Sequence, residues 1–304
     1  MVWWTTPKSA GFRSQLLPAT AAPAFFQGEA PGIQGASLSY NEAVSIHLKD
    51  WGGTGTPLLL THGMAANVHW WDTTAPTLLP RLHPVAMDFS GHGDSVWAED
   101  GVYDAPRFVE DIETARRKLG WEKMILCGHS MGARVALEYA RRHPRRLQGL
   151  IAVDFLPEFY QSKARRFEKT RTRSQPVYTN LVRMIDKFHL QPAGTLLTGE
   201  ELKDFAQHCI RHGKEGGYTW KFDWRAFLFP YEPIWETLAQ VEVPSLIVRG
   251  EHSTVITKTD FDRVVAAIPV ATGLEIARAH HHVPLDTPLE LAQAIAAFAV
   301  TLGA

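Results

Sequence analysis

The sequence predicts an α/β fold built on a doubly wound, mostly parallel sheet. Three observations lead to this prediction. The chain has 304 residues, of which 45% are hydrophobic, so it can bury one large core. Short apolar runs that end in polar residues or glycine recur along it, and stretches with helical spacing separate many of them. Such runs are typical of parallel strands that are buried on both faces.

The expected strands begin in a loosely alternating stretch, residues 36–53, where turn residues at Asn41 and at Gly52 and Gly53 indicate a hairpin. Six short apolar runs come after it, each bounded by turn residues or charges. We predict that each is a strand of the parallel sheet. The runs are TPLLLTHG (56–63), LHPVAMDFSG (82–91), EKMILCGHS (122–130), LQGLIAVDF (147–155), VPSLIVRGE (243–251) and GLEIARAH (273–280).

Two helices carry clear boundary signals. The first lies between a candidate N-cap at Asp104 and a stop at Gly120. Its apolar face consists of Phe108, Ile112, Ala115 and Leu119. The last helix is expected to begin after Thr287, which forms a capping box with Glu290 and precedes Pro288 at the first helical position.

The alternation of strand and helix stops in residues 156–235, where aromatic residues lie densely beside charges. We expect this segment to be a helical cap, inserted after the sixth strand and laid over the edge of the sheet. Residues 38–155 and 236–304 then form the core. Residues 1–37 are rich in Pro, Ala, Gly and Thr, show no period, and are predicted to be an N-terminal arm.

Composition narrows the range of partners. The formal net charge is −1, which argues against nucleic acid or an anionic membrane surface as the main partner. No stretch approaches the roughly 18 consecutive apolar residues of a membrane span. Cys127 and Cys209 make no disulfide framework, and we expect a cytoplasmic protein. Export is the alternative, because residues 14–26 faintly resemble a secretory leader. The oligomeric state is not predicted.

The sequence GHSMG, residues 128–132, places a serine at an expected tight turn between a strand and a helix. The strand-like run 122–127 precedes it and a helical stripe follows it. This is the context of a nucleophile elbow, in which Gly128 and Gly132 leave room for a sharp turn that lifts the Ser130 hydroxyl above the sheet. A serine hydroxyl becomes a nucleophile when a base removes its proton. We therefore predict that Ser130 is a nucleophile.

With these residues the chain resembles the α/β-hydrolase superfamily, in particular its capped, serine esterase-like branch. The resemblance covers residues 38–155 and 236–304. In that family an HG-x motif after an earlier strand shapes the oxyanion hole, and His62, Gly63 and Met64 match it. The resemblance implies that the backbone N–H groups of Met64 and Met131 hold the oxyanion. It also places DFSGHGDS (88–95) in the scaffold.

The general base is expected near the C-terminus, because the family order is serine, acid, histidine. The sequence RAHHHVPLDTP offers three consecutive histidines. The family spacing to the acidic-x-Pro step before the last helix selects His281, with His280 as the alternative. His280 and His282 are then bystanders, one of which could line the entrance.

The acid departs from the family pattern. Its usual place, three residues beyond the glycine of SLIVRG, is occupied by Ser253. Asp154, at the end of the strand after the nucleophile's helix, is the preferred substitute, since some relatives take their acid from that strand. Ser253 could then assist by a hydrogen bond. Glu251, and no acid at all, remain the alternatives.

These residues predict a serine hydrolase that cleaves an ester or lactone of a small to medium apolar or aromatic substrate through an acyl-enzyme. The proposed pocket residues are Trp70, Trp71, Trp220, Trp224 and His62, the last acting as a structural hydrogen-bonding group rather than in proton transfer. A carbon–carbon bond hydrolase and a slow-turnover ligand receptor are the alternatives. We expect no cofactor and no metal, because the three histidines have no carboxylates at ligand spacing.

Overall fold

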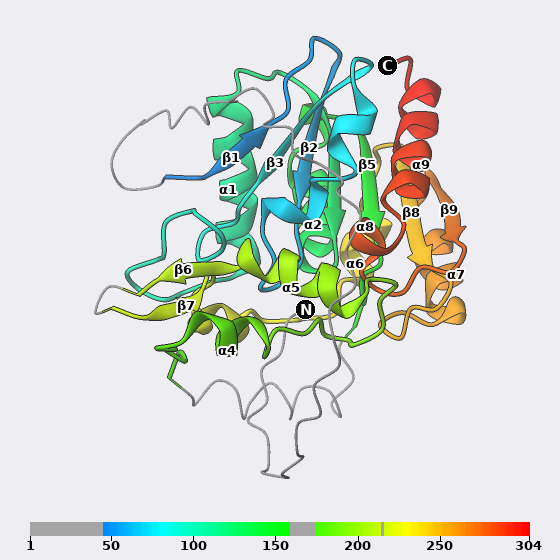
Figure 1. Cartoon of the computed structure of the whole chain (residues 1–304). Coiled ribbons are helices and arrows are strands. Elements are labelled where there is room, and N and C mark those ends of the chain that lie inside the picture. The colour runs from blue at the N-terminus through cyan, green and yellow to red at the C-terminus, as the bar shows by residue number, and fades with distance from the viewer. Residues whose placement is uncertain (1–44, 159–173, 214–215) are drawn as a thin grey trace.

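A seven-stranded sheet with the order β1-β3-β2-β4-β5-β8-β9 runs through the computed structural model, which describes residues 45–158, 174–213 and 216–304 (Figure 1). Within this sheet, as far as the described residues show it, β1 and β3 form the only antiparallel pair. The prediction of a doubly wound, mostly parallel sheet is therefore confirmed. The strands are β1 Leu48–Asp50, β2 Thr56–Thr61, β3 Leu82–Met87, β4 Met124–His129, β5 Leu147–Val153, β8 Ser245–Gly250 and β9 Ala271–Ile276.

Burial follows the position of each strand in the sheet. Every residue of β4 and β8 is buried, and Leu58, Leu59 and Leu60 of β2 have no exposed surface. These are the continuous apolar runs that a strand covered on both faces requires. The edge strand β9, by contrast, is largely exposed. The expected hairpin partner of β1, residues 36–44, lies outside the described residues, as does the N-terminal arm.

The helices of the core fall into two groups. In the first group, helix α2 packs against strands β4 and β5. The helices of this group are α1 Ala105–Lys118, α2 Met131–Arg142, α6 Trp235–Ala239 and α7 Lys258–Ala267. The other contains α8 Val283–Asp286, α9 Pro288–Thr301 and the 3-10 turns η1 Val68–Trp71 and η2 Ala75–Leu78, which contact β2 and β3. A further turn, η3 Pro144–Arg146, precedes β5. In the part of the chain that is described, no helix is long and apolar enough to cross a membrane.

Two helix boundaries show where the sequence signals hold and where one fails. The Asp104 side chain accepts a hydrogen bond from the Arg107 N–H, as predicted for an N-cap. Helix α9 begins at Pro288 as expected, but its capping box does not form. The Thr287 hydroxyl instead donates to the carbonyl of Val283 at 3.5 Å. Thr287 also ends α8, so its hydroxyl is drawn back to the preceding turn.

The segment between β5 and β8 contains α4 Leu181–Ile185, α5 Gly199–Gln207 and η4 Trp224–Leu228. It also contains an antiparallel pair, β6 Ile210–His212 and β7 Tyr218–Trp220, which the sequence did not predict because both strands are only three residues long. The segment follows β5, the fifth of the described strands; the expected hairpin partner that would make it the sixth lies outside the described residues. Figure 1 shows α4, α5, β6 and β7 beyond the carboxyl ends of the central strands.

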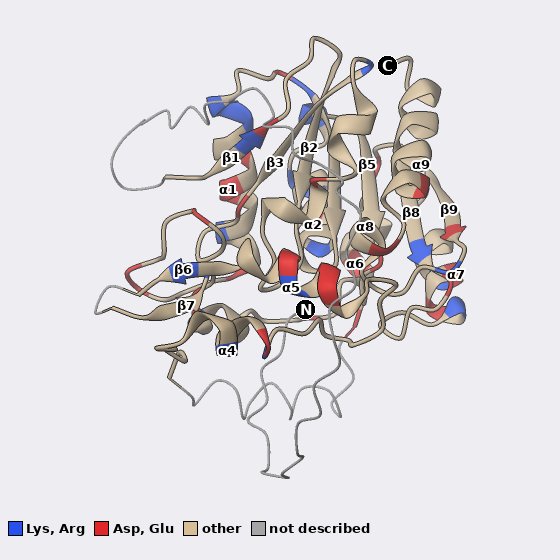
Figure 2. Cartoon of the chain, in the orientation of Figure 1, with Lys and Arg blue, Asp and Glu red and all other residues tan. Residues whose placement is uncertain are grey.

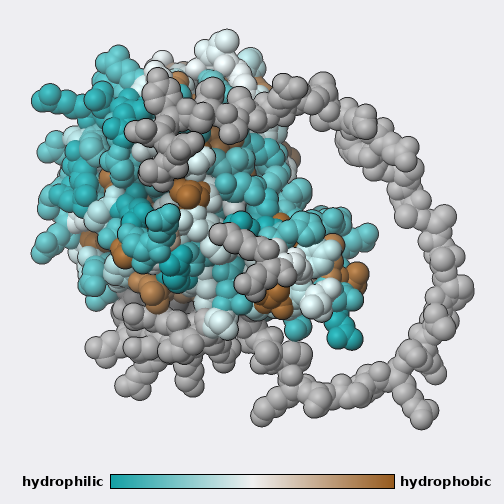
Figure 3. All heavy atoms as spheres, turned by 90° about the vertical axis from the view of Figure 1, so that its left-hand side faces the viewer, coloured by the Kyte–Doolittle hydropathy of each residue, from teal (hydrophilic) through white to brown (hydrophobic). Residues whose placement is uncertain are grey.

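Hydrogen bonds join this segment to the core. The Gly93 N–H donates to the carbonyl of Lys221 at 2.6 Å, and the Asp223 N–H donates to the carbonyl of Gly91 at 2.7 Å. Basic and acidic residues are interspersed over the described chain (Figure 2). On the face drawn in Figure 3, hydrophobic residues form small separate patches among hydrophilic ones.

Candidate active site

Ser130 lies at the turn between β4 and α2, with φ 55° and ψ −114°. A positive φ is uncommon for a residue with a side chain, so the surrounding structure must hold this conformation. The Ser130 N–H donates to the carbonyl of Val153 at 2.9 Å. A methyl group at Gly128 would overlap the carbonyl of Gly132, and one at Gly132 would overlap the carbonyl of His62. Both glycines are therefore required for the turn.

The structure brings His281 to Ser130. The Ser130 hydroxyl donates to Nε2 of His281 over 3.1 Å, although 151 residues separate them in the chain. His281 is buried in the connection between β9 and α8. His280, the alternative base, uses its backbone N–H on the carboxylate of Asp286 at 2.9 Å, and its ring lies beside that of His252.

Asp154 completes the hydrogen-bonded chain from the end of β5. Its Oδ1 accepts from Nδ1–H of His281 and from the Ser253 hydroxyl, each at 2.7 Å, and its Oδ2 accepts from the Gly250 N–H at 2.8 Å. Asp154 has no exposed surface and a φ of 44°. Burial raises the pKa of Asp154 to about 7, against the opposing hydrogen bonds from Ser253 and Gly250.

The alternative acid, Glu251, faces another way. Its carboxylate accepts from the Arg278 N–H at 2.7 Å and lies 3.9 Å from Nε2 of His252. The Glu251 residue is exposed. Asp154, rather than Glu251, is thus the carboxylate in contact with His281.

The resemblance implies that two backbone N–H groups, those of Met64 and Met131, lie near Ser130. Met131 is the first residue of α2, so its N–H has no partner within the helix. Met64 follows Gly63, where an added methyl group would approach the Cβ of Ser130 to 3.1 Å. Within the described residues, neither N–H donates a hydrogen bond in the structure. Both are available to an oxygen atom near Ser130.

His62 fixes the segment that leads to Met64. One ring nitrogen, Nδ1, donates to the carbonyl of Gly63 at 2.7 Å, and Nε2 accepts from the Phe89 N–H at 3.2 Å. Burial lowers the pKa of His62, which keeps the imidazole neutral. Because both ring nitrogens are used inside the protein, the expectation that His62 contacts a substrate finds no support in the geometry.

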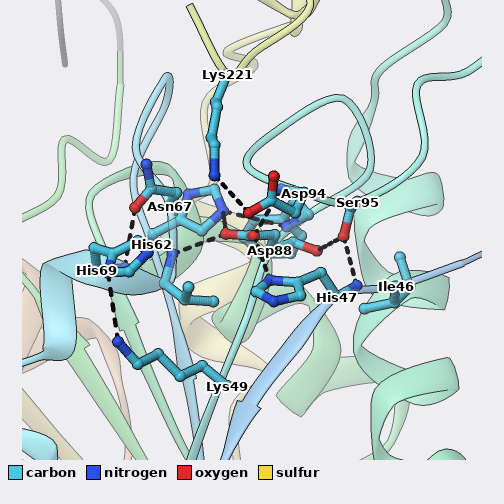
Figure 4. Close-up of polar contacts among 12 residues, drawn as sticks. Ile46, His47, Lys49, His62, Asn67, His69, Asp88, Asp94, Ser95 and Lys221 are labelled. Atoms are coloured by element: carbon cyan, nitrogen blue, oxygen red, sulfur yellow. Dashed lines mark hydrogen bonds and ion pairs between the residues drawn. The ribbon is translucent and has the colours of Figure 1, made fainter. Parts of the chain in front are cut away.

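Asp88 anchors the start of η1, which follows the segment containing Met64 (Figure 4). Its buried carboxylate accepts hydrogen bonds from the N–H of Val68 at 2.8 Å, from Nδ1 of His47 at 2.7 Å and from the N–H of Asp94 at 3.0 Å. Lys221, which follows β7, pairs with Asp94 at 2.6 Å. Through Asp94, the inserted segment is thereby tied to the hydrogen-bond network of Asp88.

The four tryptophans expected in the pocket are all buried. Trp70 packs edge-on against Phe205 of α5, and Trp224 lies between Phe222 and Phe227. Trp71 is fully buried. Trp220 lines a small cavity where the inserted segment meets the residues after Met64; its other lining residues are Ala65, Asn67, Phe188, Cys209, Lys221 and Phe222. Trp70 and Trp224 pack mainly against aromatic neighbours of the inserted segment.

One residue of the site was missed by the sequence analysis. His129, inside GHSMG, is fully buried, and its Nε2 donates to the carbonyl of His281 at 2.8 Å. His282 similarly donates from Nε2 to the carbonyl of Pro192 at 2.9 Å. Burial lowers the pKa of both rings well below the usual histidine value. The only signal in the sequence was that each histidine adjoins a predicted catalytic residue.

Comparisons with known proteins agree with this architecture. The family described as "alpha/beta hydrolase fold" matches residues 56–288. Esterase Rv0045c of Mycobacterium tuberculosis is 25% identical over 287 residues, covering 92% of this chain and 93% of that protein. A structure of that esterase, titled for its transition-metal inhibition, has a TM-score of 0.71 at 24% identity and covers 84% and 89% of the two chains. The structure of E-2-(acetamidomethylene)succinate hydrolase has a TM-score of 0.73 at 22% identity, covering 84% and 96%.

Proposed function

The chain belongs to the α/β-hydrolase fold family and is a hydrolase of that kind, and on this premise we propose that it is a serine hydrolase acting on carboxylic esters or lactones through an acyl-enzyme. The observation that carries the proposal is the hydrogen-bonded chain from the Ser130 hydroxyl through His281 to Asp154. A nucleophile, a base in contact with it and a group that orients the base are the parts that acyl transfer requires.

The proposed reaction has two halves. His281 Nε2 takes the proton of Ser130 as its oxygen attacks the substrate carbonyl, and the carbonyl oxygen becomes an oxyanion. The C–O bond then breaks, and the leaving alcohol receives the proton from His281. Water, deprotonated by His281, attacks the acyl-enzyme in the same way and releases the acid with Ser130 restored. Asp154 holds Nδ1–H throughout and stabilises the imidazolium.

We assign the oxyanion site to the backbone N–H groups of Met64 and Met131. Their support is the closeness of Gly63 to Ser130 and the unbonded N–H at the start of α2. Donors of this kind are worth about 3–4 kcal/mol of transition-state stabilisation each when they are aimed at the developing charge.

We further propose that residues 156–235 act as a cap and that the substrate is small to medium in size, with an apolar or aromatic group. Support comes from the aromatic residues that the inserted segment contributes beside the segment after Met64, including Trp220 and Phe222 at the shared cavity. Trp70, Trp71 and Trp224 form the wider aromatic wall in this proposal. We expect the protein to act in the cytoplasm, where its buried thiols Cys127 and Cys209 stay free.

The test uses p-nitrophenyl esters of short and medium acyl length. Rapid multiple turnover by the wild-type chain that is lost in Ser130→Ala, but kept in the exposed-site control Ser174→Ala, supports the proposal. Ester hydrolysis that survives Ser130→Ala contradicts it. Tight binding followed by one slow turnover favours the ligand receptor, and cleavage of a diketone but no ester favours the carbon–carbon bond hydrolase.

A further inference from the structure

Three buried histidines meet at the proposed active site. His129 comes from the end of β4, and His281 and His282 from the connection before α8. The ring centroids lie 4.9 Å apart for His129 and His281, 5.1 Å for His281 and His282, and 6.3 Å for His129 and His282. One nitrogen from each ring lies within 4.8 Å of the others. The spacing is that of a group of side chains that could hold one metal ion.

In each ring one nitrogen donates to a carbonyl or carboxylate oxygen, so the other nitrogen is an acceptor. In His129 and His282, Nε2 faces a backbone carbonyl, which only accepts, so the proton is on Nε2. The Nδ1 atoms of these two rings are then bare acceptors, and among the described residues both are buried without a hydrogen-bond partner. Buried polar atoms usually have a partner, so two such atoms in one cluster call for an explanation.

The same pattern holds in the third ring. His281 donates Nδ1–H to the carboxylate of Asp154, and its Nε2 keeps a lone pair directed at the Ser130 hydroxyl. A metal-binding histidine characteristically donates its second nitrogen to a carboxylate or a backbone carbonyl, which fixes the tautomer and orients the ring. All three rings satisfy this condition.

We propose that His129, His281 and His282 form a binding site for a divalent transition-metal ion of the zinc class, and that an ion bound there inhibits the enzyme. Neutral imidazole suits zinc, cobalt and copper, and three such ligands leave a fourth position open for water or the Ser130 oxygen. The buried carboxylate of Asp154 supplies compensating negative charge one ring away.

A bound metal ion should inhibit the enzyme because it occupies the lone pair on Nε2 of His281. A metal ion on Nε2 of His281 occupies the lone pair that would otherwise accept the Ser130 proton, so the alkoxide does not form. This part of the inference rests on the proposed function, whereas the binding of the metal does not. The expectation of no metal site counted only the three consecutive histidines. His129 is 152 residues from His281, and only the fold brings it to them.

A second histidine group provides an internal control. Among the described residues, His69, Asp72 and His208 also bring ligand atoms within 4.8 Å of one another. There, however, the Lys49 ammonium pairs with Asp72 at 2.7 Å and lies 3.4 Å from Nδ1 of His69. A divalent cation would have to displace this charge, so we expect the buried cluster to bind first.

The experiment titrates Co²⁺ into the Ser130→Ala protein and follows the visible d–d absorption, with Zn²⁺ as competitor and Mg²⁺ as the hard-cation control. We expect one tetrahedral-type cobalt spectrum per chain that Zn²⁺ removes and Mg²⁺ does not. His129→Gln and His282→Gln keep an amide donor near the position of Nε2 and remove Nδ1. Each should weaken cobalt binding by about 100-fold or more, while His208→Gln should leave it unchanged.

Zinc inhibition of ester hydrolysis, measured relative to each variant's own metal-free rate and reversed by a chelator, should be lost in His282→Gln and kept in His208→Gln. Absence of cobalt binding, or binding lost in His208→Gln alone, overturns the proposal. If the glutamine variants do not fold, anomalous diffraction from zinc-soaked wild-type crystals decides: a peak among the three rings supports the site, and a peak only at His69 and Asp72, or none, refutes it. Should Ser130→Ala retain hydrolysis, the proposed function fails while the cobalt spectrum still reports on the metal site.

Discussion

The hydroxyl of Ser253 donates a hydrogen bond to the carboxylate of Asp154 at 2.7 Å and so joins the loop after β8 to the end of β5. Ser253 stands where relatives of this chain are expected to carry their acid. In this chain the carboxylate in contact with His281 lies at the end of the neighbouring strand β5, and Ser253 contacts it through a neutral donor. The His281 ring is thus oriented by a pair of residues rather than by one.

Replacing the carboxylate should therefore remove most of the activity. In Asp154→Asn the amide cannot hold Nδ1–H of His281 in the required tautomer, and we expect kcat to fall by about 10⁴-fold, as measured with p-nitrophenyl esters. Glu251→Gln is the matched control and should stay within severalfold of wild type, because Glu251 contacts Arg278 and not His281. The reverse outcome would identify Glu251 as the acid.

The Ser253 hydrogen bond should be visible in the pH profile. Asp154 must be ionised to stabilise the imidazolium, so kcat/KM should fall as pH decreases through its raised pKa of about 7. The Ser253 hydroxyl lowers this pKa, and a hydrogen bond to a charged group is worth about 1.5–3 kcal/mol. In Ser253→Ala the acid limb should move to higher pH by about one unit. An unmoved limb, or an equal shift in the exposed control Thr254→Ala, would show that Ser253 does not act on Asp154.

The turn at Ser130 should not tolerate a methyl group at Gly128. The added carbon would overlap the carbonyl of Gly132, and the displacement of the turn should lower kcat/KM by about 100-fold or more. Gly199→Ala is the control, since no heavy atom lies within 4 Å of the added carbon there. The control should keep full activity. Full activity in Gly128→Ala would contradict the prediction, because it would show that the turn accommodates the added methyl group.

Buried histidines should make the fold sensitive to acid. Burial lowers the pKa of His92 to about 3, whereas an unfolded histidine titrates near 6.5. Between these values the unfolded chain binds a proton that the folded chain does not, so His92 contributes stability above about pH 6.5 that is lost as pH falls toward 3, about 5 kcal/mol at full extent. Asp111 and Asp154, with raised pKa values, act in the opposite direction.

Replacing His92 with phenylalanine isolates the contribution of His92 to the pH dependence of stability. The free energy of unfolding in urea should fall less steeply between pH 6.5 and 4 in His92→Phe than in the wild type. Parallel slopes for the two proteins would show that His92 is protonated in the folded state.

The central sheet and the meeting of Ser130 with His281 were accessible from the sequence. Continuous apolar runs mark strands buried on both faces, and the spacing that the α/β-hydrolase family keeps before its last helix distinguished His281 from His280. Asp154 was reachable because the position of Ser253 lacked a carboxylate and the next strand ended in one. In each case the residue types and their spacing within a short segment were enough to predict the strand or the site residue.

The rest depended on contacts between distant segments. The strands β6 and β7 are too short to produce a period, and they are stabilised by pairing with each other and by packing of Trp220 against Phe188. Thr287 has the sequence neighbours that a capping box requires, but its hydroxyl donates to the carbonyl of Val283 in the preceding turn. The contact of His129 with His281 depends on the approach of two connections at the end of the sheet, which no local spacing encodes.

The position of Asp154 has a consequence for how this protein could be rebuilt. The chain leaves β5 at Val153 and enters the inserted segment at residue 156, so the orienting carboxylate is attached directly to the base of the insertion. The Ile234 N–H closes that base by donating to the carbonyl of Pro157 at 3.1 Å. Exchanging the inserted segment for that of a relative should therefore displace Asp154. The loop after β8, by contrast, could be shortened or lengthened beyond Ser253 without moving Asp154. The loop after β8, rather than the inserted segment, is therefore the part of this chain that should accept exchange.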